Sequence, residues 1–229
     1  MKKKEVKSEI VYIFAIVLLA LAVAILSSAG FGVSMVVAPA YILSQKTGIL
    51  TFGQAEYVIQ SVLFCVFCYV MKKFKPVYLS SFITCLVYGA VLDLIRLIPC
   101  FNTEITKPET LNIVLRIFMF VFGAVLTSFS IALFFKTYLY PQVYDFFVKG
   151  VSEKFGIKRS LFKTVFDLSC LAVAVIMSLC FFKKFVGVNF GTLIIALFNG
   201  TVIGFFSKIL DKHFEFKPYF KNFAEKFSF

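Results

Sequence analysis

The sequence predicts an all-α polytopic membrane bundle, in which six transmembrane helices form two inverted three-helix repeats. The first observation is composition: 60% of the 229 residues are apolar, only 16% are charged, and the mean hydropathy is +0.92. The second is that the apolar residues come in runs of about 20, the length that crosses a bilayer core. The third is a similarity between the two halves of the chain. Soluble enzymes and soluble nucleic-acid-binding proteins are therefore nearly excluded.

Six apolar runs are predicted to span the membrane within a single domain, residues 1–229. The first run follows a lysine cluster and ends in small residues, as a signal peptide does. Its full spanning length predicts that it is retained as a structural helix. The runs cover residues 10–29, 54–71, 78–98, 111–135, 161–182 and 189–210.

The basic residues predict the orientation. With a cytoplasmic amino terminus, eighteen lysine and arginine residues fall in inner segments and four in outer segments, while Arg96 and Arg116 lie within or at the ends of spans. This asymmetry places both termini inside. It also explains the net charge of +12 without nucleic acid. The expected location is the bacterial cytoplasmic membrane with the lipid bilayer as partner, and a homodimer is left open.

The two halves of the chain carry the same motifs in the same order. Lys46-Thr47-Gly48-Ile49 precedes a span in the first half, and Lys154-Phe155-Gly156-Ile157 precedes one in the second. Residues 86–91 and 197–202 each hold a glycine inside the last span of a half, at an offset of 111. The repeats are about residues 10–98 and about residues 111–210. Three spans per repeat invert the second unit, an arrangement found in many secondary transporters.

A segment too polar or broken to span follows the first span of each repeat. The segments are residues 31–47, with Pro39, and residues 138–155, with Pro141. Gly30 and Gly32 permit a sharp turn or a close backbone approach at the start of the first one. One interpretation is an amphipathic helix lying in the membrane interface. The other is a re-entrant piece lining a pathway, because irregular backbone at membrane depth must be enclosed by protein or line a water-filled cavity.

These segments resemble those of a known family. Residues 30–41, which begin Gly-Phe-Gly, and residues 51–57 resemble the Gly-x-Gly segment and following span of the YitT/YczE-like group of bacterial membrane proteins. Pro141 and Asp145, then Gly191-Thr192 and Gly200, resemble its second-half positions, which adds Asp145 to the candidate binding residues. Tyr138-Leu139-Tyr140 departs from the group's pattern, since a second Gly-x-Gly would stand there. The resemblance implies a fold and no particular substrate.

Two carboxylates inside the predicted spans are the sharpest chemical signal. Glu56 and Asp167 stand at an offset of 111, so inverted repeats would place them in related environments. Ionisable residues in spans usually face the bundle interior and mark a pathway. Gln60 lies one turn beyond Glu56 on the same helix face. The structural alternatives are that Glu56 stabilises a helix amino terminus and that Asp167 pairs with Lys163.

Other polar residues in the spans divide between structure and binding. Asp93 and Arg96 are three residues apart and predict an ion pair within one helix, and Arg116 is expected to complete its network. Tyr88 and Asn199 lie on the polar faces of the last span in each repeat, where they either hold helices together or line a cavity. Residues 211–229 predict a basic amphipathic cytoplasmic tail suited to the anionic leaflet.

The leading functional hypothesis is a small secondary transporter of a small polar, cationic or zwitterionic solute. Intramembrane carboxylates would bind the solute or couple it to protons. The alternatives are the substrate-capturing subunit of a vitamin or metal importer and a non-transporting membrane regulator. The sequence contains no catalytic triad, phosphate-binding loop or paired metal site, so we predict no enzymatic activity, no cofactor and no catalytic or metal site.

The charge asymmetry makes a direct topological prediction. A reporter fused after Phe229 should be active only if it functions in the cytoplasm, because both termini are expected there. The measurement is paired fusions to an alkaline phosphatase, which is active outside, and to a green fluorescent protein, which folds inside. Phosphatase activity without fluorescence would contradict the predicted orientation.

Overall fold

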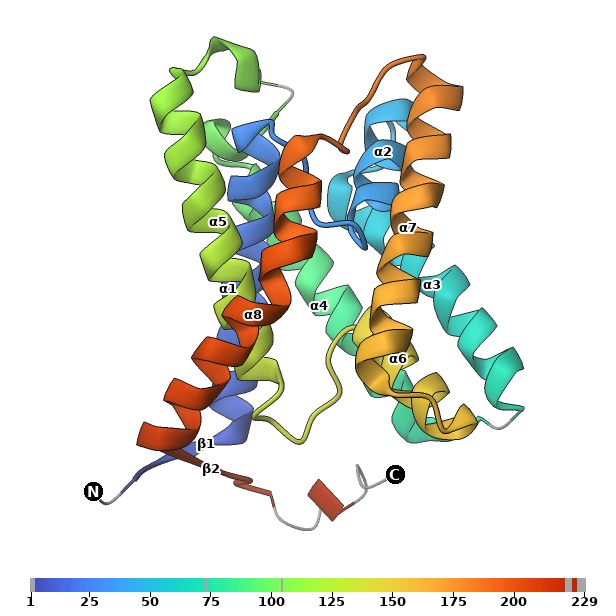
Figure 1. Cartoon of the computed structure of the whole chain (residues 1–229), viewed down its shortest axis with the longest axis vertical. Coiled ribbons are helices and arrows are strands. Elements are labelled where there is room, and N and C mark those ends of the chain that lie inside the picture. The colour runs from blue at the N-terminus through green and yellow to red at the C-terminus, as the bar shows by residue number, and fades with distance from the viewer. Residues whose placement is uncertain (1–2, 73, 104, 221–223, 226–229) are drawn as a thin grey trace.

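The computed structural model describes residues 3–72, 74–103, 105–220 and 224–225, and it is a helical bundle (Figure 1). Six helices of the described residues are long and apolar enough to cross a membrane, which makes the chain a multi-pass all-α membrane protein as predicted. Their bounds agree closely with the six predicted runs. They are α1 (Ser8–Ala29), α3 (Phe52–Met71), α4 (Leu79–Arg96), α5 (Ile113–Phe134), α7 (Arg159–Phe182) and α8 (Phe190–His213).

One shorter helix follows the first span of each half. They are α2 (Ala38–Thr47) and α6 (Val143–Phe155). Each half therefore has the order long helix, short helix, long helix, long helix. Single-turn 3₁₀ helices lie in the connections, at Pro76–Tyr78, Pro99–Phe101 and Pro108–Thr110.

Both short helices have the course of re-entrant segments, which enter and leave the bundle at the same end. α1 ends and α3 begins at the end of the bundle opposite the termini, so the chain enters and leaves there, and α6 does the same at the end that carries the termini (Figure 1). We call these the far end and the terminal end. Ile42 of α2 and Phe146 of α6 are fully buried. α2 packs on α3 and α7, while α6 packs on α3, α4 and α7. Protein therefore encloses both segments.

Helix packing follows an approximate two-fold relation between the halves. α1 packs along α5, which is its counterpart. The contact of α1 with α4 is matched by that of α5 with α8, and the contact of α3 with α6 by that of α7 with α2. One pair breaks the relation: α3 packs along α4, whereas α7 and α8 stand apart in the described chain (Figure 1).

Two glycines at equivalent positions show this difference locally. A methyl group at Gly89 of α4 would overlap the Tyr57 ring and lie 3.0 Å from the Gly53 carbonyl oxygen of α3. The absence of a side chain thus allows α3 and α4 to approach closely. A methyl group at Gly200 of α8 would meet no atom of the described chain within 4 Å.

Side chains supply the first hydrogen bonds of several long helices. Thr51 caps α3 in a capping box with Gln54, and Asn189 caps α8 with Thr192. Asn112 accepts a hydrogen bond from Val114 N–H at the start of α5. These contacts satisfy backbone donors that have no partner inside a helix. The interruptions between spans are therefore encoded by local capping signals as well as by polarity.

The two terminal segments pair at the terminal end. β1 (Lys4–Lys7) and β2 (Phe214–Lys217) form a parallel two-stranded sheet. The Lys217 ammonium hydrogen-bonds the Glu5 carboxylate, which lowers the pKa of Glu5 and raises the pKa of Lys217. The tail predicted over residues 211–229 begins with the last three residues of α8 and continues as the strand Phe214–Lys217, which pairs with β1. Lys221, Phe223, Lys226 and Phe227 lie outside the described residues.

We expect alanine substitution to change stability differently at Gly89 and at Gly200. Gly89→Ala should destabilise the fold by about 1–3 kcal/mol through overpacking between α3 and α4. Gly200→Ala should leave stability unchanged or raise it by about 0.5–1 kcal/mol, since alanine favours helix and finds open space. The measurement is thermal unfolding of purified full-length variants in detergent. Equal melting temperatures for the two variants would contradict the asymmetric packing.

Candidate functional site

A cavity of about 80 Å³ lies where the two re-entrant segments meet. The first segment contributes Ser34 and its neighbours up to Val37, and the second contributes residues between Pro141 and Asp145. Side chains from α1, α4, α5, α7 and α8 complete the walls. The volume suffices for a few water molecules or one small solute. Both halves of the fold therefore build a single site.

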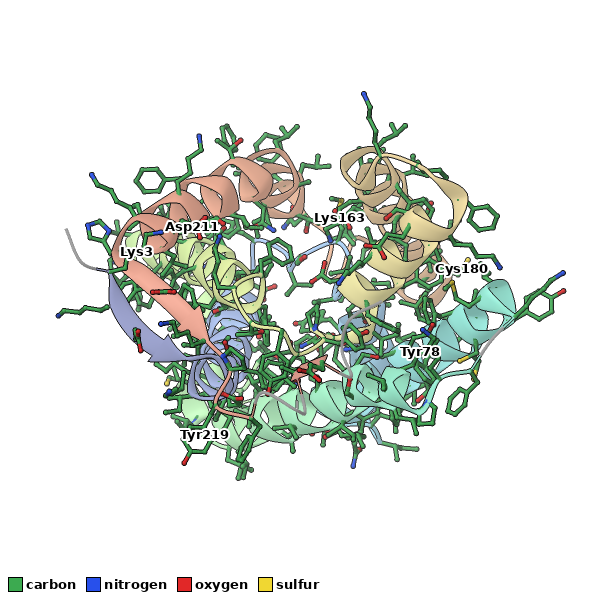
Figure 2. The ribbon with its side chains drawn as sticks, turned by 90° about the horizontal axis from the view of Figure 1, so that it is seen from below. Lys3, Tyr78, Lys163, Cys180, Asp211 and Tyr219 are labelled. Atoms are coloured by element: carbon green, nitrogen blue, oxygen red, sulfur yellow. The ribbon has the colours of Figure 1, made fainter. Side chains whose placement is uncertain are left out.

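The cavity's charges form one compact cluster. Lys163 Nζ lies 3.2 Å from Asp145 Oδ1 of α6 and 3.2 Å from Asp167 Oδ1 of α7. Both aspartate side chains are about one-fifth exposed. Figure 2, viewed from the terminal end, shows Lys163 beside the space between α7 and α8. The lysine thus bridges two carboxylates that belong to different helices.

Three uncharged polar residues, Tyr88, Gln142 and Asn199, line the same cavity. Tyr88 of α4 is 1% exposed, and its hydroxyl has no hydrogen-bond partner in the described chain. Gln142 Nε2 is also buried and without a partner there. Asn199 of α8 accepts a hydrogen bond of 2.7 Å from the Ser128 hydroxyl. Because unpaired buried polar groups cost free energy, two of them at one cavity indicate a place for a bound polar molecule.

Glu56 lies behind the cavity wall. Its Oε2 accepts hydrogen bonds from Gln60 Nε2 at 2.9 Å and from the Tyr144 hydroxyl at 3.0 Å. Gln60 also hydrogen-bonds the second re-entrant segment. Its Nε2 donates to Gln142 Oε1, and its Oε1 accepts from Val143 N–H. Glu56 is fully buried and is not among the cavity's lining residues.

The expectation of related environments for the two carboxylates is therefore wrong. Asp167 lines the cavity and pairs with Lys163, as the structural alternative predicted. Glu56 instead anchors the second re-entrant segment through neutral hydrogen-bond donors. Tyr144 connects the two sites, since it both lines the cavity and donates to Glu56.

A vestibule lies beyond each re-entrant segment. At the terminal end, a space of about 180 Å³ is lined by residues 137–141 and shares Phe134, Pro141, Asp145 and Lys163 with the cavity. At the far end, a space of about 540 Å³ shares none of its lining residues with the cavity. The cavity thus adjoins the terminal vestibule and lies apart from the far one.

The first re-entrant segment forms the separation. Val33 N–H donates to Gly187 O at 3.0 Å, which joins the segment to the loop between α7 and α8. Gly30 and Gly32 have φ values of +72° and +99°, which gives the sharp turn that these two glycines predict. A side chain at Gly32 would overlap Thr192 and lie 2.9 Å from Asn189 N.

The two prolines occupy corresponding places in the re-entrant segments. Pro39 lies in the first turn of α2, where a proline needs no hydrogen-bond donor. Pro141 precedes α6 and lines both the cavity and the terminal vestibule. Each proline therefore helps to set where irregular backbone becomes helix.

The predicted ion pair of Asp93, Arg96 and Arg116 is wrong, because these three described residues make no ion pair with one another. The Asp93 carboxylate instead accepts from the Thr51 hydroxyl at 2.5 Å and from Gly53 N–H at 2.8 Å. It is held there by the positive end of α3. Arg96 donates to the Thr103 hydroxyl at 3.0 Å, and Arg116 donates to Ala29 O at 2.9 Å.

Three residues of the site, Lys163, Tyr144 and Gln142, are not assigned to it by sequence patterns. The sequence predicts Lys163 as an inner basic residue and a partner of Asp167, and its place inside an apolar run is the signal that also indicates a functional role. Tyr144 and Gln142 carry no such signal, because polar residues in a segment of uncertain depth are unremarkable until the fold is known.

A protein-family model matches residues 6–208, which include both re-entrant segments and all the spans except the last five residues of α8. The chain belongs to DUF6198, a family of unknown function. Comparisons with curated proteins and with solved structures find no match.

Gly32 lies in the segment that separates the cavity from the far end, and we expect this position to require glycine. Gly32→Ala should destabilise the fold by more than Gly156→Ala, which carries a positive φ of +66° but meets no atom of the described chain within 4 Å. Both changes carry about 1–3 kcal/mol of backbone strain, and only Gly32→Ala adds overlap with α8. The measurement is thermal unfolding in detergent. Equal losses would show that close packing at Gly32 contributes nothing.

Proposed function

We propose that this protein is a secondary transporter of a small cationic or zwitterionic solute. The observation that carries the proposal is a cavity between two re-entrant segments, with a vestibule beyond each of them. A transporter needs one binding site that two gates can expose in turn to opposite sides. The two re-entrant segments, at equivalent places in the halves, supply a pair of such gates.

The charge of the site favours a cation. Asp145 and Asp167 face one ammonium group, that of Lys163, and the cavity has no other charged lining residue in the described chain. The formal net charge is therefore −1. A solute with a positive group compensates this charge, whereas an anion is repelled. Glu56, behind the wall, is the candidate for coupling solute binding to movement of the second re-entrant segment.

The packing of the halves supports alternation between two states. The closed pair α3 and α4 and the separated pair α7 and α8 are equivalents under the two-fold relation. Exchanging the roles of the halves would separate the first pair and close the second. That exchange would also open the far gate and close the terminal one. We place the protein in the bacterial cytoplasmic membrane with the terminal end in the cytoplasm, on the charge asymmetry of the sequence.

The competing hypothesis of a solute-capturing subunit requires access from one side only. The two vestibules and two gates favour a transporter over this hypothesis and over a non-transporting regulator. The resemblance to the YitT/YczE-like group is compatible with all three, because it carries no substrate. Access from both sides is therefore the property that separates the hypotheses.

Cysteine labelling tests this proposal without knowledge of the solute. In a chain whose six native cysteines are replaced by alanine, Ser34→Cys places a thiol on the cavity wall. It should react with a membrane-impermeant maleimide added from either side of oriented vesicles, because each gate opens in turn. The measurement is the labelled fraction, read by mass spectrometry.

Two exposed lysines provide matched controls. Lys46→Cys at the far end and Lys158→Cys at the terminal end should each react from one side only. Labelling of Ser34→Cys from the terminal side alone, with both controls behaving as expected, would contradict alternating access and favour the solute-capturing hypothesis.

A further inference from the structure

The cavity already binds a primary ammonium group, that of Lys163. Its Nζ lies 3.2 Å from a carboxylate oxygen of Asp145 and 3.2 Å from one of Asp167. The two acceptors come from different helices, so their spacing is set by the packing of α6 on α7. The arrangement shows which chemical group fits between them: a compact cation with several N–H donors.

We propose that Lys163 is a tethered stand-in for the amine of the transported solute. The solute's ammonium displaces Lys163 from Asp145 and Asp167, and Lys163 returns when the solute leaves. This inference rests on the proposed transport function and names its substrate class: a small primary amine that carries an oxygen atom, as amino alcohols do.

The terminal vestibule can receive the Lys163 ammonium when the solute displaces it. It lines the terminal vestibule as well as the cavity, so its ammonium can move into the vestibule while its Cα stays in place. A lysine side chain has four methylene groups, and such chains carry a charge to water from an apolar position. The exchange keeps the carboxylates paired throughout, which avoids leaving two like charges uncompensated at membrane depth.

The unpartnered groups of the cavity wall define the rest of the solute. The Tyr88 hydroxyl is buried without a hydrogen-bond partner and offers a further acceptor to an ammonium. Gln142 Nε2 is a buried donor without a partner, and it needs an acceptor that an alkylamine lacks. A hydroxyl or carbonyl oxygen near the amine provides it. The cavity of about 80 Å³ limits the solute to a few heavy atoms.

Three simpler interpretations of the same residues are less complete. A purely structural lysine bridge explains the aspartates but leaves Tyr88 and Gln142 unpaired. A metal site lacks support, because the described residues contain no cluster of three or more suitable ligands. A quaternary ammonium has the right charge but no N–H donors for the two carboxylates.

Ethanolamine and choline form a matched pair of probes for the test. Both carry one positive charge and one hydroxyl, but choline's nitrogen has three methyl groups and no N–H donor. Binding to the purified full-length protein in detergent is measured by titration calorimetry and by the shift in melting temperature. Ethanolamine should bind at least tenfold more tightly than choline, since charge-assisted hydrogen bonds are lost with choline.

Variants at Lys163 separate a stand-in from a structural bridge. Lys163→Met removes the internal competitor, so ethanolamine should bind at least tenfold more tightly than to the wild type. Lys163→Arg keeps both carboxylates paired and the fold intact, and its bidentate guanidinium should weaken ethanolamine binding. If Lys163→Met does not fold, the weaker binding expected for Lys163→Arg still tests the proposal. Asp167→Asn should abolish the preference for ethanolamine over choline.

Lys136→Met is the matched control. It breaks a lysine–aspartate pair of 2.7 Å with Asp211, away from the cavity, and should leave ethanolamine binding unchanged. Equal binding of ethanolamine and choline, or unchanged ethanolamine binding in both Lys163 variants, would overturn the inference.

The labelling experiment on Ser34→Cys uses no solute, so the two proposals fail separately. Two-sided labelling without amine binding would leave a transporter of another substrate class. Amine binding with labelling from one side only would leave an amine-binding protein that does not transport.

Discussion

The fold depends on the need to enclose irregular backbone at membrane depth. Hydrocarbon offers no hydrogen-bond partners, so residues that enter the bilayer without helical bonds must find them in protein. Val33 N–H reaches Gly187 O in the first half, and Val143 N–H reaches the Gln60 side chain in the second. Both bonds cross between the halves. The same requirement that joins the halves therefore creates the cavity between them.

The two halves meet this requirement with different chemistry. The first re-entrant segment is docked by glycines and backbone contacts, as Gly32 shows at Thr192. The second is docked by side chains, through Glu56, Gln60 and Tyr144. A backbone contact tolerates little change, whereas a buried polar network has alternative partners within reach. The second segment is also the one whose Asp145 contacts the cavity's cation.

Most of the architecture could be predicted from sequence, because runs of about 20 apolar residues have few alternatives to spanning a bilayer. The positive φ of Gly30 and Gly32 was also predictable, since few other residues adopt it. The contacts of Asp93 could not be predicted from sequence. Spacing of three residues favours Arg96 as partner, but the free N–H groups at the start of α3 lie on another helix, invisible to local patterns.

Long-range pairing explains the remaining differences. β2 forms against a strand about 210 residues earlier, and Lys163 meets Asp145 only because α6 folds back into the bundle. Lys163 also shows that the position of a charge in the fold matters as well as its sign. Lys163 is one of the eighteen basic residues from which the orientation is predicted, and as the sole cation among the described lining residues it determines the charge of the cavity. One residue can serve both roles, because α7 starts at the terminal end and passes the cavity on its way through the bundle.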